Sequence, residues 1–478
     1  MSQLTDVSTK IPDKTAEDAM RDLFQEQRLA SRTLPTLTIK QRVNALNTIR
    51  ALVLENGEAI QKSICNDFGN RSSAETEMLE MIPVFNAIRY TRRHLGAWMR
   101  PEIRPVDLTF QPGRAWIRYE PLGVIGIIAP WNYPLLLSLS PLVDAIAAGN
   151  RVMIKPSELT PCFSELLHKL ISSHFDVTEV TVVTGGPSIA REFASLPFDH
   201  LIFTGSTSIG REVMKAAAEN LTPVTLELGG KSPAVVCADY PLEKAARSIA
   251  FGKFLNAGQT CIAPDYVLVP KDVCREFADE VIKRAQRAYP TVQDNPDYST
   301  IINERHRTRL FDALAEAKAG GATLLTTNLE LQQTVIAPTV VLDAPAGCSL
   351  LQDEIFGPVL PIVSYGKLEE AFDFINERPK ALALYCFSND KIVQNRVLQR
   401  VGSGGVTING TLLHIAQDAL PFGGVGASGM GAYHGRDGFR RFSHMRSIYK
   451  VGRLNVFEQL GPPWGTLAKR VASVLKRR

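Results

Sequence analysis

One cysteine and one glutamate could together carry out covalent chemistry on a carbonyl group. They lie in Gly258-Gln-Thr-Cys261 and in Glu227-Leu-Gly-Gly-Lys-Ser-Pro233. A cysteine attacks a carbonyl carbon only as its thiolate, and a carboxylate nearby can activate the water that hydrolyses the resulting thioester. A single cysteine is more often a small buried hydrophobic residue, and a single glutamate is more often a solvated surface residue. Neither residue alone therefore identifies a catalytic site.

Two further segments could bind a nucleotide, because each follows a predicted strand. In Phe203-Thr-Gly-Ser-Thr-Ser-Ile-Gly210 the glycines let the backbone approach a ligand, and the helix N-terminus that follows attracts phosphate. In Lys155-Pro-Ser-Glu158 a carboxylate could accept hydrogen bonds from ribose hydroxyls. The first segment lacks the middle glycine of the usual dinucleotide fingerprint, and a tight strand-to-helix turn explains it equally well. A capping Ser-Glu turn is the alternative for the second.

The elements that must position these residues alternate between short apolar strands and helices. Helical spacing covers residues 16–68 and 74–98. Strands are predicted over 123–129, 151–155, 180–183, 200–203, 233–236 and 266–269, and helices over 134–148, 162–174, 189–194, 209–220, 242–255 and 271–289. This rhythm implies a parallel, doubly wound sheet, and its restart near Gly229 indicates a second α/β unit. The alternating stretch 115–120 is typical of an edge strand.

Composition excludes several classes of protein. The 478 residues correspond to two or three domains, at roughly 100 to 200 residues per domain. Hydrophobic residues make up 45% and charged residues 21%, as in soluble globular proteins, and the net charge of +4 is too small to indicate a nucleic-acid partner. The seven cysteines are scattered and never form C-x-x-C, so no disulfide framework or metal site is expected, and a reducing compartment, the cytoplasm, is favoured.

Three terminal or apolar segments bear on membrane contact. Residues 1–14 are polar and lack the apolar region of a signal peptide. Residues 122–149 are long enough for a span of roughly 20 residues, but three prolines interrupt them, so a buried segment is predicted instead. The basic, amphipathic stretch 461–478 could contact an acidic membrane, pack on another subunit or remain free, and membrane contact is the less favoured of these.

Taken together, the segments resemble the aldehyde dehydrogenase superfamily over residues 20–450. Seven motifs occur in the order of that family: Pro130-Trp-Asn-Tyr-Pro134, Lys155-Pro-Ser-Glu158, Phe203-Thr-Gly-Ser206, Leu226-Glu-Leu-Gly-Gly-Lys231, Gly258-Gln-Thr-Cys261, Glu354-Ile-Phe-Gly-Pro358 and Pro421-Phe-Gly-Gly424. The glycine-rich run 421–435, followed by Phe442-Ser-His444, resembles the class 3 branch. Residues 67–71, 263–266 and 294–298 are similar to the bacterial coniferyl aldehyde dehydrogenases within that branch.

The resemblance implies a role for each of nine residues. Cys261 is the expected nucleophile, the side-chain amide of Asn132 and the Cys261 backbone N–H stabilise the oxyanion, and Glu227 activates water. The cofactor is expected to meet Lys155 and Glu158 at the adenosine ribose, Gly205 and Ser206 at the pyrophosphate, Glu354 at the nicotinamide ribose and Phe356 beside the nicotinamide ring. Because a carboxylate would repel a 2′-phosphate, the expected cofactor is NAD, with NADP as the alternative. No metal is expected.

The resemblance also implies the fold, an α/β fold of the aldehyde dehydrogenase type. Two Rossmann-type α/β domains and a small β bridging or oligomerisation element are expected. The expected divisions are a cofactor-binding domain over 1–104 and 124–228, a catalytic domain over 229–402, the bridging element with C-terminal loops over 105–123 and 403–450, and the basic tail over 451–478.

The expected activity is NAD(P)+-dependent oxidation of an aldehyde to a carboxylic acid through a thiohemiacetal and a thioester on Cys261. Coniferyl aldehyde, giving ferulate, or a related aromatic aldehyde is the leading substrate. Medium- and long-chain fatty aldehydes are the alternative, and a catalytically silent binding protein on the same scaffold is the second alternative. Asn409-Gly410 stands where related class 3 sequences usually read Asn-Asp, in a loop expected near the substrate entrance. A homodimer is expected.

Overall fold

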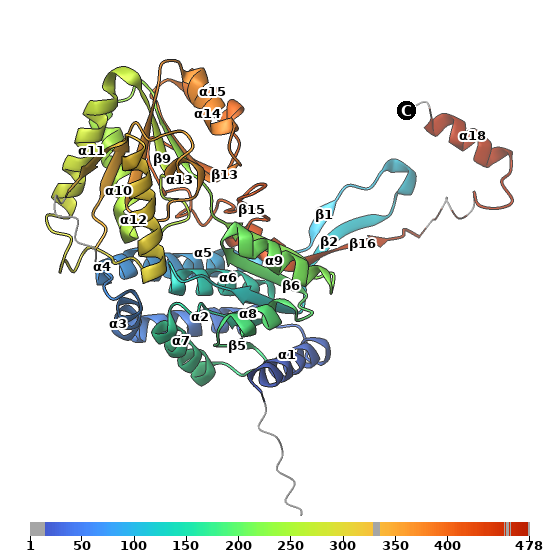
Figure 1. Ribbon diagram of the computed structural model, residues 1–478. Coiled ribbons are helices and arrows are strands. Elements are labelled where there is room, and N and C mark those ends of the chain that lie inside the picture. The colour runs from blue at the N-terminus through green and yellow to red at the C-terminus, as the bar shows by residue number, and fades with distance from the viewer. Residues whose placement is uncertain (1–14, 328–334, 454, 456–457, 459, 477–478) are drawn as a thin grey trace, which may run out of the picture.

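The computed structural model describes residues 15–327, 335–453, 455, 458 and 460–476. Two large sheets, each flanked by helices, lie one above the other, and a small antiparallel sheet extends to one side as an arm (Figure 1). The expected α/β architecture with a separate β element is therefore confirmed. The expected absence of a signal peptide at residues 1–14 falls outside the described residues.

The first unit is built on a six-stranded sheet in the order β15-β7-β6-β3-β4-β5, parallel except for the pair β15-β7. Its strands are β3 (Val124–Ile128), β4 (Arg151–Lys155), β5 (Val180–Val182), β6 (His200–Gly205), β7 (Val224–Leu228) and β15 (Gly429–Met430). Its helices are α1 (Ala16–Thr33), α2 (Ile39–Glu55), α3 (Gly57–Phe68), α4 (Ser73–Thr76), η1 (Glu77–Met81), α5 (Ile82–Trp98), α6 (Pro134–Ala148), α7 (Pro161–His174), α8 (Pro187–Ala194) and α9 (Thr207–Ala218).

Strand β3 explains why this sheet needs helices on both faces. All five of its residues are buried, as expected for a strand inside a parallel sheet. Because successive side chains point to opposite faces, Val124 and Ile128 join one apolar cluster while Ile125 and Ile127 join another. Residues 122–149, which were predicted to be a buried segment, contain β3 and the almost wholly buried helix α6.

The second unit is built on a seven-stranded sheet in the order β10-β11-β12-β9-β8-β13-β14, parallel except for β10-β11. Its strands are β8 (Pro233–Val236), β9 (Tyr266–Pro270), β10 (Thr323–Thr326), β11 (Thr339–Leu342), β12 (Val359–Tyr365), β13 (Ala381–Phe387) and β14 (Ser403–Ile408). Its helices are α10 (Leu242–Phe254), η3 (Leu255–Gly258), η4 (Lys271–Val273), α11 (Cys274–Ala288), α12 (Glu304–Ala319), α13 (Ser349–Gln352), α14 (Leu368–Asn376) and α15 (Lys391–Arg400).

The arm is a three-stranded antiparallel sheet in the order β1-β2-β16. It comprises β1 (Glu102–Arg104), η2 (Leu108–Phe110), β2 (Arg114–Pro121) and β16 (Ser443–Lys450), with α16 (Gly435–Arg441) leading into β16. Strand β2 is the central strand, so the prediction of an edge strand at 115–120 is wrong. Alternation reports the two faces of a strand and carries no information on how many neighbours it has.

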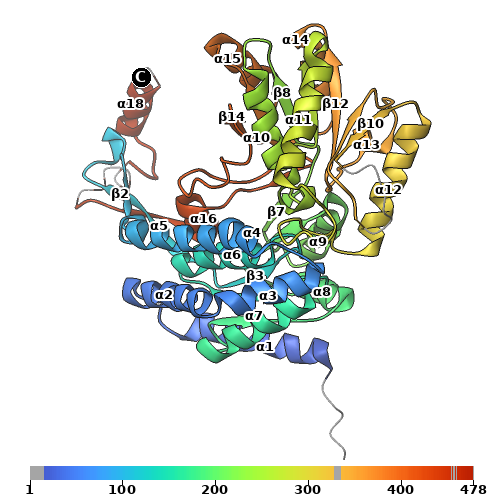
Figure 2. The same ribbon diagram turned by 90° about the vertical axis from the view of Figure 1, so that its left-hand side faces the viewer.

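The predicted strands and helices are otherwise found within a few residues of their expected bounds. The predicted divisions between domains remain predictions. Strand pairing places β1, which lies within the predicted cofactor-binding domain, in the arm, and it places β14, which lies within the predicted bridging element and C-terminal loops, in the seven-stranded sheet. The amphipathic tail forms α18 (Thr466–Leu475), which lies on the same side of the molecule as the arm in both views (Figures 1 and 2). Among the described residues, no helix is both long and apolar enough to cross a membrane.

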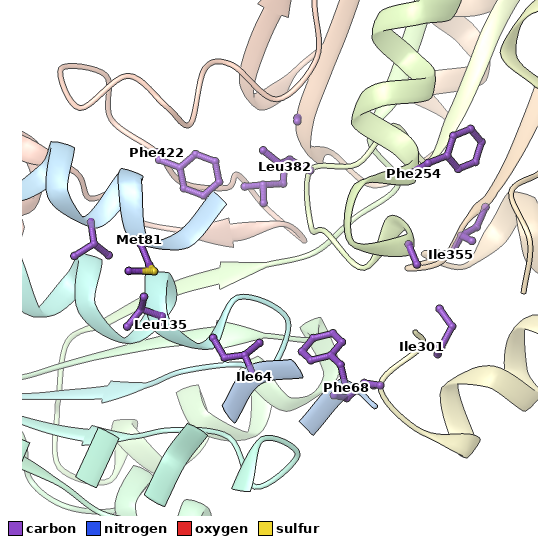
Figure 3. Close-up of a cluster of buried hydrophobic side chains, with 14 of the residues drawn as sticks. Ile64, Phe68, Met81, Leu135, Phe254, Ile301, Ile355, Leu382 and Phe422 are labelled. Carbon is purple, nitrogen blue, oxygen red and sulfur yellow. The ribbon is translucent and has the colours of Figure 1, made fainter. Parts of the chain in front are cut away.

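A single cluster of buried side chains joins the two units. Figure 3 shows Ile64, Phe68 and Leu135 of the first unit below Leu382 and Ile355 of the second. All of these side chains are at most 3% exposed. Because the apolar core is continuous across the junction, the two units hold a fixed relation around the space between them.

The close packing on β3 predicts that Gly126 tolerates no side chain. A Cβ atom there would lie 2.7 Å from a side-chain atom of Leu201 and 2.7 Å from the ring of Phe198. Gly126→Ala is therefore expected to lower the free energy of unfolding by about 1–3 kcal/mol, as overpacking does. Chemical denaturation measures this. Gly347→Ala, which meets nothing within 4 Å, is the control, and equal stability of the two variants would contradict the packing argument.

Candidate active site

Four neighbouring strands of the six-stranded sheet end at one edge and carry the predicted site residues there. Since β7, β6, β3 and β4 run parallel, their carboxyl ends meet at that edge, where ligands of open α/β sheets bind. Glu227 lies near the end of β7 and Gly205 ends β6, while Asn132 follows β3 and Lys155 ends β4. The order of the strands thus brings together residues that are far apart in the sequence.

A cavity of about 370 Å³ separates this edge from the second unit. Seven of the nine predicted site residues line it, namely Asn132, Gly205, Ser206, Glu227, Cys261, Glu354 and Phe356. Lys155 and Glu158 lie outside its wall, at the next strand end. There the Lys155 Nζ atom is 3.6 Å from Glu158 Oε2 and donates a hydrogen bond of 2.7 Å to the Pro156 carbonyl.

Cys261, the predicted nucleophile, follows a left-handed turn of the backbone. Asn256, Ala257 and Gly258 have φ angles of 50°, 49° and 74°. A Cβ atom on Gly258 would lie 2.2 Å from the carbonyl oxygen of Gly357, so only glycine fits at this position. The turn ends the helical path of α10 and η3 and leads the chain to Cys261 in the wall of the cavity.

Asn132 is held from several sides. Its Nδ2 atom donates to the Gln259 carbonyl at 3.1 Å. Its backbone carbonyl oxygen accepts hydrogen bonds from Arg71 Nη1 at 2.7 Å and from Asn256 Nδ2 at 3.1 Å. The loops that carry Asn132 and Cys261 are therefore tied directly to each other, and one Nδ2 hydrogen of Asn132 remains for another acceptor.

Arg71 and Glu80 form a buried ion pair behind Asn132. Arg71 Nη2 and Glu80 Oε1 are 3.1 Å apart, and both side chains are fully buried. Glu80 Oε2 also accepts bonds from the backbone N–H groups of Leu135 at 2.8 Å and Leu136 at 3.1 Å, in the first turn of α6. A carboxylate is favourable at a helix N-terminus because the N–H groups there have no partner within the helix.

Burial controls the charges in the cavity. Burial raises the pKa of Glu227 well above its ordinary value, and neither carboxylate oxygen has a hydrogen-bond partner within the described part of the chain. Burial, followed by the charges of Glu354 and Glu227, raises the pKa of Cys261 to about 12. Burial and the charge of Asp265 raise the pKa of Glu354 to about 7. Burial in the resting cavity thus favours the neutral forms of both the Cys261 thiol and the Glu227 carboxyl group.

The residues along the other half of the cavity fit a dinucleotide. Ser206 caps α9, with its Oγ atom accepting a 3.5 Å bond from the Ile209 N–H, so this helix presents its N-terminus for phosphate. Gly229 lies against Glu354, and a Cβ atom there would lie 2.2 Å from a carboxylate oxygen. The cavity therefore offers a helix N-terminus for phosphates, a carboxylate for ribose hydroxyls and the Phe356 ring for a flat group.

Two aromatic residues flank Asn132, and they take different roles. Trp131 lines the cavity and packs edge-to-face on Phe356, with ring centroids 5.4 Å apart. Tyr133 is 8% exposed and lies outside the cavity wall, where its hydroxyl is 2.6 Å from Thr260 Oγ1.

Three residues behind the cavity gave no functional signal in the sequence. Arg71 donates a hydrogen bond to the backbone carbonyl of Asn132 and forms an ion pair with Glu80. Both residues are distant from Asn132 in the sequence, so no local pattern reveals this contact. Lys253 is wholly buried, its Nζ atom has no hydrogen-bond partner within the described residues, and burial lowers its pKa to about 8. The seven cysteines are all free. Within the residues that the structure covers, no group of three His, Cys, Asp or Glu side chains could hold a metal ion.

Comparison with known proteins assigns the family. The model of the aldehyde dehydrogenase family matches residues 3–448. The chain belongs to this family. Aldehyde oxidation with NAD or NADP is the activity of its members, so the predicted family, enzyme class and cofactor class are confirmed.

Individual relatives narrow the likeness. A Pseudomonas aeruginosa protein named "Probable coniferyl aldehyde dehydrogenase" is 49% identical over 443 residues, which are 93% of each chain. The rat "Aldehyde dehydrogenase, dimeric NADP-preferring" is 40% identical over 441 residues, 91% of this chain and 96% of the relative. The substrate-bound structure of Staphylococcus aureus AldH has a TM-score of 0.90 at 38% identity and covers 95% of this chain and 99% of its own. The predicted resemblance to the coniferyl aldehyde dehydrogenases and to the class 3 aldehyde dehydrogenases is thus confirmed.

The ion pair behind Asn132 predicts a coupled loss of stability and activity. Arg71→Met leaves the Glu80 carboxylate buried without its partner, which typically costs about 3–5 kcal/mol of unfolding free energy. The variant also removes the hydrogen bond that holds the Asn132 backbone carbonyl. Because the Asn132 side-chain amide would then be less firmly positioned, kcat is expected to fall by up to about 10²-fold, as after loss of an oxyanion donor. Chemical denaturation and steady-state kinetics measure the two effects.

Adding Glu80→Gln to Arg71→Met is expected to restore part of the stability, because the unpaired charge is removed. The matched control is Lys215→Met, which breaks an ion pair whose side chains are 73% and 66% exposed and is expected to change stability by about 1 kcal/mol at most. If Arg71→Met and Lys215→Met behaved alike, the buried pair would not support Asn132.

The charges around Cys261 predict how its alkylation depends on pH. Because the pKa of the thiol is raised to about 12, the thiolate fraction in the enzyme without cofactor increases about tenfold per pH unit below that value. Iodoacetamide labelling of Cys261, followed by peptide mass spectrometry, is expected to accelerate accordingly. Glu354→Gln removes a nearby negative charge and is expected to accelerate labelling at pH 8.5, while the exposed Cys162 is unaffected. Equal labelling of Cys261 in both proteins would contradict this account.

Proposed function

We propose that the protein oxidises coniferyl aldehyde, or a closely related aromatic aldehyde, to the carboxylic acid with NAD or NADP. One observation carries the proposal: Cys261, Asn132 and Glu227 face a single cavity whose other half fits a dinucleotide. The substrate class is supported by the relatives named as coniferyl aldehyde dehydrogenases, which are 41–49% identical to this chain. The presence of all three side chains in the cavity wall argues against a silent binding protein.

The reaction begins at Cys261. Its thiol loses a proton to water, and the thiolate sulfur forms a bond to the carbonyl carbon of the aldehyde. The π electrons of the C=O bond pass to oxygen, which gives the oxyanion of a thiohemiacetal. The Asn132 Nδ2 hydrogen that is not bonded to Gln259, together with the Cys261 backbone N–H, stabilises the oxyanion. Removal of one such donor typically lowers the rate by about 10² to 10³.

Glu227 serves the second half of the reaction. A bound NAD(P)+ supplies the acceptor for the hydride that leaves the thiohemiacetal carbon, and a thioester remains on Cys261. Glu227 takes a proton from water; burial raises its pKa and so makes its carboxylate a stronger base, and neither carboxylate oxygen has a hydrogen-bond partner among the described residues. The resulting hydroxide attacks the thioester carbonyl, the acid is released, and the Cys261 sulfur is the leaving group.

Six residues would hold the cofactor. Gly205 and Ser206 would bind the pyrophosphate at the N-terminus of α9, and Glu354 the nicotinamide ribose, with Phe356 beside the ring. Lys155 and Glu158, at the end of β4, would meet the adenosine ribose. The Glu158 side chain is 41% exposed, so its carboxylate can face a ribose hydroxyl and disfavour a 2′-phosphate, which supports a preference for NAD.

A cytoplasmic homodimer completes the proposal. The arm exposes apolar side chains on its strands, including Ile103 at 78% and Met445 at 56%, and its outer strand β16 pairs on one side within the described residues. Such a surface favours association with a second chain, and a relative is named as dimeric. Free cysteines throughout the chain suit a reducing compartment.

An assay of NADH absorbance tests the proposed activity. The panel contains coniferaldehyde, benzaldehyde, hexanal and dodecanal, with NAD+ and with NADP+. The wild type is expected to act best on coniferaldehyde with NAD+. Cys261→Ala is expected to lose the signal completely, while the exposed control Cys162→Ala keeps it. Highest activity with dodecanal would replace the substrate class by fatty aldehydes, and absence of activity with every aldehyde would leave a binding protein.

A further inference from the structure

The cavity that holds Cys261 is adjoined by a second cavity, which we call the outer cavity. The two share Leu137, Ile415 and Tyr433 in their walls. The outer cavity has a volume of about 70 Å³. Its wall includes exposed and half-exposed residues such as Ala416 and Asp418, so it lies toward the molecular surface.

Tyr433 stands between the two cavities. It is 1% exposed, and after burial the charges of Glu227, Asp144 and Cys261 all contribute to raising its pKa. Glu227 and Cys261 line the inner cavity, whereas Asp144 lines the outer one. Because the two cavities share three wall residues, the part of a substrate that extends beyond Tyr433 from an aldehyde carbon at Cys261 would lie next to the outer cavity.

The two ends of this path differ in chemistry. The shared wall is apolar at Leu137 and Ile415, and it suits an aromatic ring and its attached double bond. The outer cavity adds five polar residues, which are Asn86, Ser140, Asp144, Asp418 and His434. An unbranched alkyl chain would leave these groups facing apolar atoms, whereas an oxygen on the far side of a ring would meet them.

Two of these polar side chains have unused hydrogen-bonding capacity. Asp418 is half-buried, and its carboxylate has no hydrogen-bond partner within the described residues. Asn86 Oδ1 accepts a 2.8 Å hydrogen bond from Arg89 Nη2. The Asn86 Nδ2 group therefore points away from Arg89, and it has no hydrogen-bond partner among the described residues. His434 stacks on Phe422 with ring centroids 5.5 Å apart, so it forms a flat wall beside them.

We propose that the outer cavity recognises the ring hydroxyl of a hydroxylated aromatic aldehyde, with Asp418 accepting from the hydroxyl and the Asn86 amide donating to a ring oxygen. This inference rests on the proposed function and names the chemical group that determines its substrate. A site that hydrogen-bonds a substrate hydroxyl discriminates strongly against analogues that lack it, because its polar groups are then left unpaired. Asp418 and Asn86 are accordingly specificity-determining residues, and the oxidation itself takes place at Cys261.

The loop that contains Gly410, where this sequence departs from related class 3 sequences, leads to the residues of the outer cavity. The segment that follows Gly410 supplies Ile415 to both cavities and Asp418 to the outer one. Gly410 itself lies outside both walls. A substitution at this position can therefore reach the two cavities only through the path of the chain toward Asp418.

Three aldehydes with the same carbon skeleton test the assignment. They are coniferaldehyde, with a hydroxyl and a methoxy group, 3,4-dimethoxycinnamaldehyde, with no hydroxyl, and unsubstituted cinnamaldehyde. Asp418→Ala is expected to lower kcat/KM for coniferaldehyde by roughly 10- to 100-fold, as after loss of a hydrogen bond to a charged group. The values for the other two aldehydes are expected to stay within about twofold. Asn86→Ala is expected to lower kcat/KM for the two oxygenated aldehydes and to spare cinnamaldehyde.

Asp373→Ala, which removes an exposed carboxylate that lines neither cavity, is the matched control and is expected to change none of the three values. Thermal unfolding of each variant checks that the fold is retained. If wild type oxidises coniferaldehyde and the ratio of coniferaldehyde to cinnamaldehyde kcat/KM is unchanged in both variants, the outer-cavity assignment is overturned and the proposed function stands. If wild type oxidises cinnamaldehyde but not coniferaldehyde, the outer-cavity assignment is overturned, and the proposed function stands only for an aromatic aldehyde without the ring hydroxyl.

Discussion

The position of Asn132 depends on a fully buried guanidinium group. Arg71 donates to the Asn132 carbonyl at 2.7 Å and pairs with Glu80, which in turn binds two N–H groups at the start of α6. The ring centroids of Phe68 and Tyr133 each lie 4.9 Å from the Cζ atom of Arg71. A charge in such a place is stable only when it is paired and hydrogen-bonded, so the network has one low-energy arrangement. That arrangement fixes the loop of Asn132 relative to the loop of Cys261.

The cavity in front of this network has the opposite character. Glu227 and Cys261 lie where burial opposes charge, and the carboxylate oxygens of Glu227 have no partner among the described residues. In the supporting network Arg71 and Glu80 compensate each other's charge as an ion pair, although Arg71 Nε has no hydrogen-bond partner among the described residues. Within the same part of the chain, Glu227 has no such ion-pair partner for its charge. This division is common in active sites, since groups that are free to bind substrate or move a proton destabilise the resting protein unless rigid surroundings hold them.

The sequence predicted the strands and helices well because a doubly wound fold leaves a strong periodic pattern, as in the wholly buried β3. The likeness to a family then identified Cys261, Asn132 and Glu227, which the cavity brings together. Pairing between strands was less accessible, and β2 was wrongly expected at an edge because alternation does not count neighbours. Arg71, Lys253 and Asp418 were missed, since their importance arises from contacts between distant segments that no local spacing records.

The two-residue strand β15 has a consequence for how the protein is made. Gly429 is the residue opposite Glu227 in the antiparallel pair β15-β7, and a Cβ atom on it would lie 2.1 Å from the Leu226 carbonyl. A nascent chain emerging from the ribosome therefore exposes β7, with its glutamate, as an uncovered edge until residue 429 has been translated. Nearly nine-tenths of the polypeptide must be synthesised before the backbone around Glu227 is complete. Premature termination upstream of this point would thus yield a chain that retains Cys261 and its loop but has an open sheet edge beside them.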